Sequence, residues 1–244
     1  MTMTEQEQEQ EQEQGQEQGR GHGAEERDAE VLRVVRALED ERSSVRLRAA
    51  MAAGTAPDAR LVDTLVERCA VEPEFFVRDM LTWALTRLPA DLTLPRMLQE
   101  LRSERAQARS QALHTLSKLG DRQAWPAITR GHLTDPDDEV ARAAWRTAVL
   151  LVPDGAQGPL AEILATQLGR GGRDTQLSLS RALIELGDVI LPVLNGAARD
   201  PDPDVRAHAL ATERILADPD TGFAYAIEEA KRVVALGGSG QAGD

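Results

Sequence analysis

The sequence has a single cysteine, Cys69, and aromatic residues make up only 3% of its 244 residues. One cysteine cannot form an internal disulfide, so the cysteine content does not indicate an oxidising compartment. With so few aromatic rings, a core must be built from Ala, Leu and Val, and Ala and Leu favour helices over strands. The composition therefore predicts an all-α protein and disfavours a large β-sandwich or barrel.

Long apolar runs are also missing from the sequence. No run approaches the roughly 18 residues that a membrane-spanning helix needs. The N-terminus also lacks the apolar segment of a secretory signal. We therefore expect a cytoplasmic protein that makes no contact with a membrane.

The formal net charge of −13 is unevenly distributed. Residues 1–30 contain ten acidic and two basic residues and carry −8, which leaves −5 over the other 214 residues. The first 23 residues alternate Glu and Gln and then become Gly-rich. Because such a segment buries too little apolar surface to order itself, we predict a disordered tail over 1–27. A folded region over 28–236 and a flexible tail over 237–244 complete the predicted organisation.

A repeat of about 31 residues organises the folded region, with six anchor residues spaced by 32, 31, 32, 35 and 30. In every copy, the residue four positions after the anchor is Ala or Leu, and the residue seven positions after it is Ala or Thr. Offsets of four and seven lie on one helical face, and the small residues let a neighbouring helix approach closely. The anchors are Val45, Val77, Ala108, Val140, Thr175 and Val205.

A second helical stretch precedes each anchor, and in several copies it contains a proline: Pro95, Pro126, Pro159 or Pro192. Proline in the first turn of a helix removes no intrahelical hydrogen bond, so each proline predicts the start of a first helix. Each repeat is then a helix, a turn and a helix. The predicted repeats cover 28–56, 58–89, 91–120, 122–152, 155–187 and 188–217, and one further helix covers 222–236.

Turn residues separate the two helices of a repeat. Acidic residues in 135–138 and 200–204 should cap the helices that follow them, because side-chain oxygens accept hydrogen bonds from the free N–H groups there. Gly120 and Gly187 each follow a predicted helix and fit its C-terminal cap. The glycine-rich run 169–173 is predicted as the long turn of the fifth repeat.

The run Asp-Pro-Asp-Val-Arg-Ala-His-Ala-Leu at 202–210 resembles the HEAT repeat, in particular the short bacterial PBS-lyase HEAT-like repeats. Arg46, Arg78, Arg109 and Arg206 match the arginine that follows the valine of that motif. Ala141 and Gln176 depart from it. The resemblance implies a right-handed α-α superhelix, a HEAT/armadillo-type solenoid of about six helical hairpins with a C-terminal capping helix. It also implies that the second helices line the concave side.

Catalytic and metal-binding motifs are scarce in this sequence. None of the four histidines lies in a His-Glu-x-x-His arrangement, and there is no Cys-x-x-Cys pair or Gly-x-x-x-x-Gly-Lys-Ser/Thr loop. Cys69 shares an apolar side with Leu65, which predicts a buried structural thiol rather than a nucleophile. We expect no enzymatic activity, no metal and no cofactor.

The face opposite the buried stripe, at offsets 2, 6 and 9 from each anchor, supplies the candidate partner-binding residues. Met51 and Trp83 are apolar anchors, whereas arginines from two successive repeats form a basic patch that can pair with carboxylates or phosphates. Two alternatives without a binding function stay open. Trp83 can be buried against its neighbouring repeat. The arginines can reflect a general abundance of arginine, at 26 against two lysines, as in a GC-rich bacterial genome. The candidates are Met51, Trp83, His114, Arg142, Arg146 and Arg181.

These observations favour a non-enzymatic scaffold or interaction module that binds a protein or peptide through its concave face. The resemblance also admits a regulatory sensor subunit that acts with a transcription regulator, or a HEAT-type nucleic-acid-binding or base-excision enzyme. The acidic charge balance disfavours nucleic acid as the partner, since a large excess of Lys and Arg is absent.

Overall fold

The computed structural model describes residues 26–238, with side chains to residue 236, and this part of the chain contains helices and turns but no strand. The all-α prediction is therefore confirmed. The tails predicted for 1–27 and 237–244 lie outside the described residues, except that residues 26, 27, 237 and 238 are helical. The chain divides into two compact units, with the boundary between Thr93 and Leu94.

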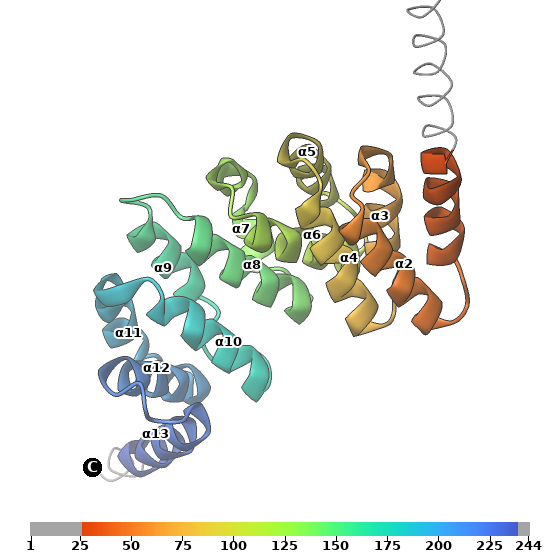
Figure 1. The fold of residues 1–244 in the computed structure, drawn as a ribbon. Helices are drawn as coiled ribbons and strands as arrows, with labels where there is room; N and C mark the ends of the chain where they lie inside the picture. Colours follow the sequence, from red (N-terminus) through yellow and green to blue (C-terminus); the bar gives the residue numbers. More distant parts are fainter. Residues whose placement is uncertain (1–25, 239–244) are drawn as a thin grey trace, which may run out of the picture. The chain divides into compact units, whose positions relative to one another are not determined.

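The first unit begins with a helix over residues 26–38. The helices of this unit are coloured red to amber in Figure 1. Its core is aliphatic, with Leu38, Leu65, Leu81 and Leu85 at most 1% exposed. Helix α2 contacts α4, and α3 packs on α4. The elements that follow the first helix are α2 (Ser43–Thr55), the 3₁₀ helix η1 (Ala59–Leu61), α3 (Val62–Cys69), α4 (Phe75–Arg87) and α5 (Ala90–Glu100), which spans the boundary between the units.

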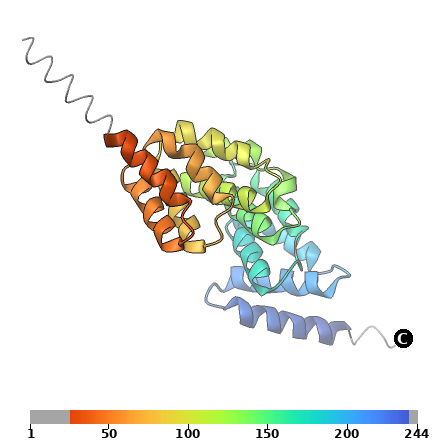
Figure 2. The same cartoon turned by 90° about the vertical axis from the view of Figure 1, so that its right-hand side faces the viewer.

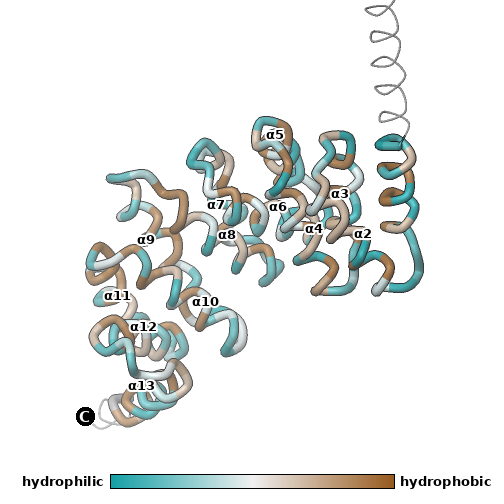
Figure 3. The backbone as a smooth tube through the Cα atoms, viewed as in Figure 1, coloured by the Kyte–Doolittle hydropathy of each residue, from teal (hydrophilic) through white to brown (hydrophobic). Residues whose placement is uncertain are grey.

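The second unit stacks its helices in two rows. One row is α6, α8, α10 and α12, in which each helix contacts the next, and the other contains α7, α9 and α11 (Figure 1). The hydropathy colours of Figure 3 alternate along these helices, as expected for helices with one buried face. The elements are α6 (Ala106–Leu119), η2 (Arg122–Ala127), α7 (Arg130–Leu133), α8 (Asp138–Leu151), α9 (Gln157–Ala165), α10 (Arg173–Ile184), η3 (Gly187–Ile190), α11 (Leu191–Ala197), α12 (Pro203–Ala217) and α13 (Phe223–Gly238).

The repeat seen in the sequence corresponds to α2, α4, α6, α8, α10 and α12, because each anchor is the third residue of one of these helices. The residues four positions later are all buried: Ala49, Leu81, Ala112, Ala144, Leu179 and Ala209. Five of the six small residues at offset seven are buried, and Ala52 is exposed. This offset faces the preceding repeat, as the hydrogen bond from Thr147 Oγ1 to the Leu113 carbonyl (2.9 Å) shows. In the described chain no repeat helix of this kind precedes α2, and Ala52 instead lines an open pocket with residues of the helix over 26–38.

The proline prediction is correct in two repeats and wrong in two. Pro159 and Pro192 lie in the first turn of α9 and of α11. Pro95 is the sixth residue of α5, which begins at Ala90, so the proline removes one intrahelical bond inside the helix rather than starting it. Pro126 lies inside the 3₁₀ helix η2, which ends at Ala127, and the α-helix α7 begins only at Arg130.

The predicted caps of α6, α8 and α12 are present. The cap predicted at Gly187 is wrong, because α10 ends at Ile184 with Glu185 as its cap and Gly187 is the first residue of η3. Asp137 accepts hydrogen bonds from the Glu139 and Val140 N–H groups (2.9 and 3.2 Å) at the start of α8. Asp202 accepts one from the Asp204 N–H (2.8 Å) at the start of α12. Gly120 caps α6 with a φ of 66°, a left-handed conformation that glycine adopts without strain.

Helix α13 covers the outer face of α12, and the two run side by side (Figures 1 and 2). Phe223, Ile227 and Ala230 of α13 bury Ala207 and Ala211 of α12, at offsets 2 and 6. The predicted last helix is therefore present, and it occupies a face that is open on α8 and α10. Across residues 26–238 no helix is long and apolar enough to cross a membrane.

Candidate arginine pocket

Arg142, Arg146 and Arg181 line one pocket of about 450 Å³ in the second unit. Arg142 and Arg146 stand one turn apart on α8, and Arg181 comes from α10. We call this site the arginine pocket. Its remaining lining residues are Val149, Asp174, Leu177, Ser178, Ala182 and Glu185.

The three guanidinium groups differ in their surroundings. Arg142 is partly buried and donates a hydrogen bond from Nη1 to Glu139 Oε1 (3.0 Å), and its buried Nε has no hydrogen-bond partner among the described residues. Arg146 is exposed, with its Nη1 3.4 Å from Nδ1 of His114 on α6. Because a guanidinium only donates, Nδ1 is the acceptor. Arg181 is exposed, and no ion pair of its side chain is found within the described residues.

The helix face that contains the pocket arginines is positively charged at its centre. Offsets 2, 6 and 9 of α6, α8, α10 and α12 contain four arginines and no acidic residue, although the protein is acidic overall. Asp174, in the first turn of α10, and Glu185, just after that helix, place carboxylates at the two ends of the pocket. The pocket is therefore a short cationic strip with an apolar floor and acidic ends.

The other two candidates, Met51 and Trp83, belong to the first unit. Met51 is 48% exposed and Trp83 is 39% exposed. The indole ring lies directly on Gly54 of α2, since a Cβ built there would be 2.2 Å from the ring. Trp83 thus packs on its neighbouring repeat and still presents an open edge. The structure brings together His114, Arg142, Arg146 and Arg181, and leaves these two in the other unit.

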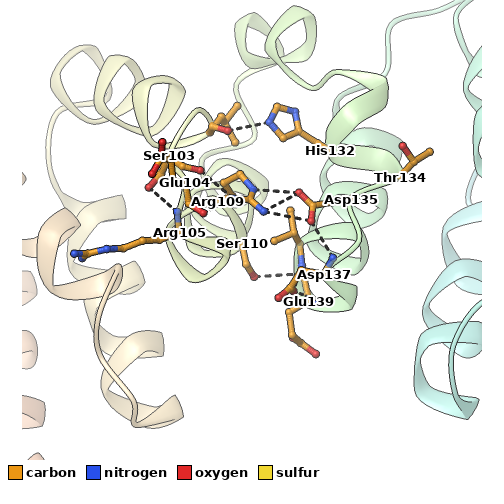
Figure 4. A network of polar contacts seen from close by, with 12 residues as sticks. Ser103, Glu104, Arg105, Arg109, Ser110, His132, Thr134, Asp135, Asp137 and Glu139 are labelled. Atoms are coloured by element: carbon orange, nitrogen blue, oxygen red, sulfur yellow. Dashed lines mark hydrogen bonds and ion pairs between the residues drawn. The ribbon is translucent and has the colours of Figure 1, made fainter.

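The arginines of the HEAT-like motif stabilise the turns between helices and do not line the pocket. Nη1 of each one donates to two backbone carbonyls of the turn that precedes its own helix, at 2.6–3.0 Å. Arg109 also pairs with Asp135, which opens the turn of the next repeat (Figure 4). Asp135 in turn accepts from the Asp137 N–H (2.9 Å). The arginines that hold turns in this way are Arg46, Arg78, Arg109 and Arg206.

In the two repeats that lack the motif arginine, other side chains donate hydrogen bonds to the carbonyls of the turn. In the fourth repeat, where Ala141 replaces the arginine, Arg170 donates to the Asp135 carbonyl (2.6 Å) and to Asp138 Oδ1 (2.9 Å). In the fifth repeat, Gln176 Nε2 lies 3.3 Å from the Gly169 carbonyl and 3.4 Å from that of Gly171. Arg170 therefore holds a turn, and the glycine-rich run is a structural loop, as predicted.

A buried polar network at His208 was missed by the sequence argument. The Gly169 N–H donates to Nδ1 of His208 (3.1 Å), and Nε2 lies 3.0 Å from both the Gln176 carbonyl and Ser180 Oγ. Burial lowers the pKa of His208 to about 4. The histidine joins α10, α12 and the loop between α9 and α10 and is not open to a ligand. Nothing in the sequence distinguishes it from an exposed histidine of the motif.

Cys69 is 4% exposed, and burial raises the pKa of its thiol to about 12, so the prediction of a buried thiol is confirmed. Within residues 26–236, no three His, Cys, Asp or Glu side chains are grouped so as to hold a metal ion.

Comparison of the sequence with protein-family models finds no match, and comparison with curated proteins finds none either. The HEAT resemblance therefore depends on the residues of this chain alone.

Proposed function

We propose that this chain is a non-enzymatic, HEAT-type interaction module whose arginine pocket binds an acidic segment of a partner protein. One observation carries the proposal. Arg142, Arg146 and Arg181 converge on one pocket, whereas the four motif arginines are engaged in holding turns. The abundance of arginine in this sequence therefore does not by itself explain the pocket, because its three arginines do not hold turns as the motif arginines do.

The chemistry of the pocket fits a polypeptide with both carboxylates and apolar side chains. A guanidinium binds a carboxylate through two parallel hydrogen bonds, and Arg146 and Arg181 are exposed enough to offer both donors. Val149, Leu177 and Ala182 form an apolar floor for an aliphatic side chain. The volume of about 450 Å³ falls within the range of roughly 300–1,000 Å³ typical of ligand pockets.

The proposed architecture is a right-handed solenoid of six hairpins in a cytoplasmic protein. In such a solenoid the second helices line the concave face, and Met51 and Trp83 would offer apolar contacts on the part of it that the first unit supplies. Arginine and tryptophan are enriched among residues that dominate binding energy at interfaces. The partner can itself be a transcription regulator, in which case the chain acts as its sensor subunit.

Nucleic acid is the disfavoured alternative. The arginines would attract phosphates, but the carboxylates of Asp174 and Glu185 line the same pocket and would repel a backbone that passes through it. A base-excision activity would also need a flipped base to enter this pocket.

The experiment is a binding titration with a fluorescent peptide in which Glu alternates with Leu. The double variant Arg146→Glu/Arg181→Glu should weaken binding by at least about tenfold. The matched control Arg199→Glu, an exposed arginine outside the pocket, should leave binding unchanged. A peptide with Gln in place of Glu and a duplex DNA complete the set. Equal binding of the acidic peptide by all three proteins, or a preference for DNA that follows the two pocket arginines, would overturn the proposal.

A further inference from the structure

We infer that the acidic segment bound by the arginine pocket is an amphipathic helix that lies along α8 and α10 and presents two carboxylates one helical turn apart. The inference rests on the proposed function, because it requires that the pocket accept acidic polypeptide. It adds the conformation of that polypeptide and the spacing of its acidic residues. Every residue of the pocket belongs to the second unit.

The arginine pocket extends along the two helices that form it. Its lining on the α10 side covers residues 174–185, which corresponds to a rise of about 16 Å, and its lining on α8 covers residues 142–149. The two helices contact each other and start side by side, since Thr175 Oγ1 donates a hydrogen bond to Asp138 Oδ2 (3.1 Å). The pocket therefore has room for about three turns of a helix laid parallel to its walls.

The equivalent face of the last repeat is already covered by a helix. Helix α13 lies alongside α12, and its apolar side packs on Ala207 and Ala211, at offsets 2 and 6 (Figures 1 and 2). The same two offsets hold Arg142 and Arg146 on α8, and offset 6 holds Arg181 on α10. The chain thus shows that this face accepts a helix. Where the alanines suit an apolar helix, the arginines require an acidic one.

The positions of the arginines match one turn of a bound helix. Arg142 and Arg146 are four residues apart on α8, a rise of about 6 Å, and Arg181 enters at the level of Arg146 from the other wall. Carboxylates at positions i and i+4 of a helix have the same separation along its axis. One carboxylate then meets Arg142, whose ion pair with the exposed Glu139 is weak, and the other lies between Arg146 and Arg181.

The hydrogen-bonding groups of the lining favour a helix over an extended segment. Between the acidic ends, the lining side chains are arginine or apolar except for Ser178. Arginine only donates hydrogen bonds, so Ser178 is the one side chain there that can accept a bond from a peptide N–H. A helix pairs its backbone groups internally, and its apolar side chains can pack on Val149, Leu177 and Ala182. A bound strand would leave more of its N–H groups without acceptors.

The acidic ends of the pocket limit how many acidic residues the helix can carry. Glu185 lies one turn beyond Arg181, and Asp174 stands at the opposite end, in the first turn of α10. Further glutamates one turn outside the central pair would come against these two carboxylates and be repelled. The ligand is therefore a helix with two acidic residues one turn apart, flanked by uncharged or basic residues.

The test titrates the full chain with fluorescent peptides of Ala, Gln, Leu and two Glu. In the first peptide, the glutamates stand four positions apart on the side of the leucines. In the second, of the same composition, they stand two positions apart and point to opposite sides of a helix. The first peptide should bind several-fold more tightly, with a gain of helical circular dichroism on binding. Arg146→Glu/Arg181→Glu should remove this preference, and the matched control Arg199→Glu should preserve it.

A third peptide separates recognition of a helix from attraction by charge alone. It has the central pair of the first peptide and a further glutamate one turn outside each end, and it should bind more weakly despite its larger negative charge. Equal binding of the first two peptides, or tighter binding of the third, overturns the inference; if the double variant then weakens all three, the proposed function stands. If the double variant binds every peptide as the native chain does, both are wrong.

Discussion

Arg46 donates hydrogen bonds from Nε and Nη2 to the two carboxylate oxygens of Glu72, both at 2.7 Å, and both side chains are almost fully buried. Arg68 donates to the same carboxylate, and the Glu74 N–H binds its Oε1. Burial by itself raises the pKa of Glu72, but these hydrogen bonds outweigh it and hold the pKa at about 2. The pair joins the turns before α2 and α4, so it links two successive repeats of the first unit.

Removal of one partner of this pair should be costly. Arg46→Ala leaves the Glu72 carboxylate buried with fewer donors, and it frees the carbonyls of Asp40 and Glu41 that Arg46 also holds. We expect a loss of about 3 kcal/mol in the free energy of unfolding, measured by urea denaturation. Arg48→Ala, on the exposed side of the same helix, should cost less than about 0.5 kcal/mol. Similar losses for the two variants would contradict a structural role for the pair.

His208 should make stability depend on pH in a defined window. Its folded pKa of about 4 lies below the unfolded value of about 6.5, so the unfolded chain binds more protons between these values. The contribution is complete above pH ~6.5 and is lost as the pH falls towards ~4, by about 3 kcal/mol. His208→Gln should therefore make the urea midpoint nearly independent of pH across this window. A slope that survives His208→Gln would exclude this histidine as its source.

Glu72 should act at lower pH. Its folded pKa of about 2 lies below the unfolded value, so its contribution is present above pH ~4.3 and is lost as the pH falls towards ~2. A Glu72→Gln variant should therefore lose less stability between these values than the native chain does. Urea midpoints measured at several pH values would check this, and parallel curves for the two proteins would show that another carboxyl group is responsible.

Gly54 should control the position of Trp83. A Cβ at residue 54 would lie 2.2–2.9 Å from three atoms of the indole ring, so Gly54→Ala must displace the ring. We expect a red shift of tryptophan emission and easier quenching by acrylamide, since the ring loses its cover. The same substitution in a Trp83→Phe background reports on the remaining tryptophans and should show no change. Identical spectra with and without the methyl group would mean that the ring does not pack on Gly54.

Helix α13 should stabilise the end of the second unit. Ile227 is 3% exposed in the contact with α12, whereas Tyr225 is 58% exposed, with its ring centroid 5.1 Å from the guanidinium carbon of Arg214. Ile227→Ala should reduce the free energy of unfolding by about 2–4 kcal/mol, and Tyr225→Ala should change it far less. Calorimetry of the two variants provides the comparison. Equal effects would indicate that α13 does not depend on its buried face.

The sequence was most informative where the same physical constraint recurs. Each of α2, α4, α6, α8, α10 and α12 places a small or apolar residue against a neighbour at fixed offsets, so six copies reinforce one pattern. The first helices have no such constraint on their starts. In the fourth repeat, the Thr129–His132 capping box restarts the helix after Pro126, which a rule based on proline position does not anticipate.

The candidate site was predicted in part for a similar reason. Arg142, Arg146 and Arg181 were found because helical offsets determine which residues share a face. The acidic ends of the pocket, Asp174 and Glu185, lie outside those offsets and were not anticipated. The substitution of Arg170 for the missing motif arginine depends on a long loop that brings it back to Asp135, and sequence spacing does not reveal such a contact.

Charge reversal is the most direct test of the central claim, that the arginine pocket recognises acidic polypeptide through Arg146 and Arg181. A fluorescent peptide of alternating Glu and Leu is compared with its Lys-Leu counterpart, on the native chain and on Arg146→Glu/Arg181→Glu. The account predicts that the native chain prefers the acidic peptide and that the double variant prefers the basic one. If both proteins rank the two peptides in the same order, the pocket does not select its ligand by charge and the account is wrong.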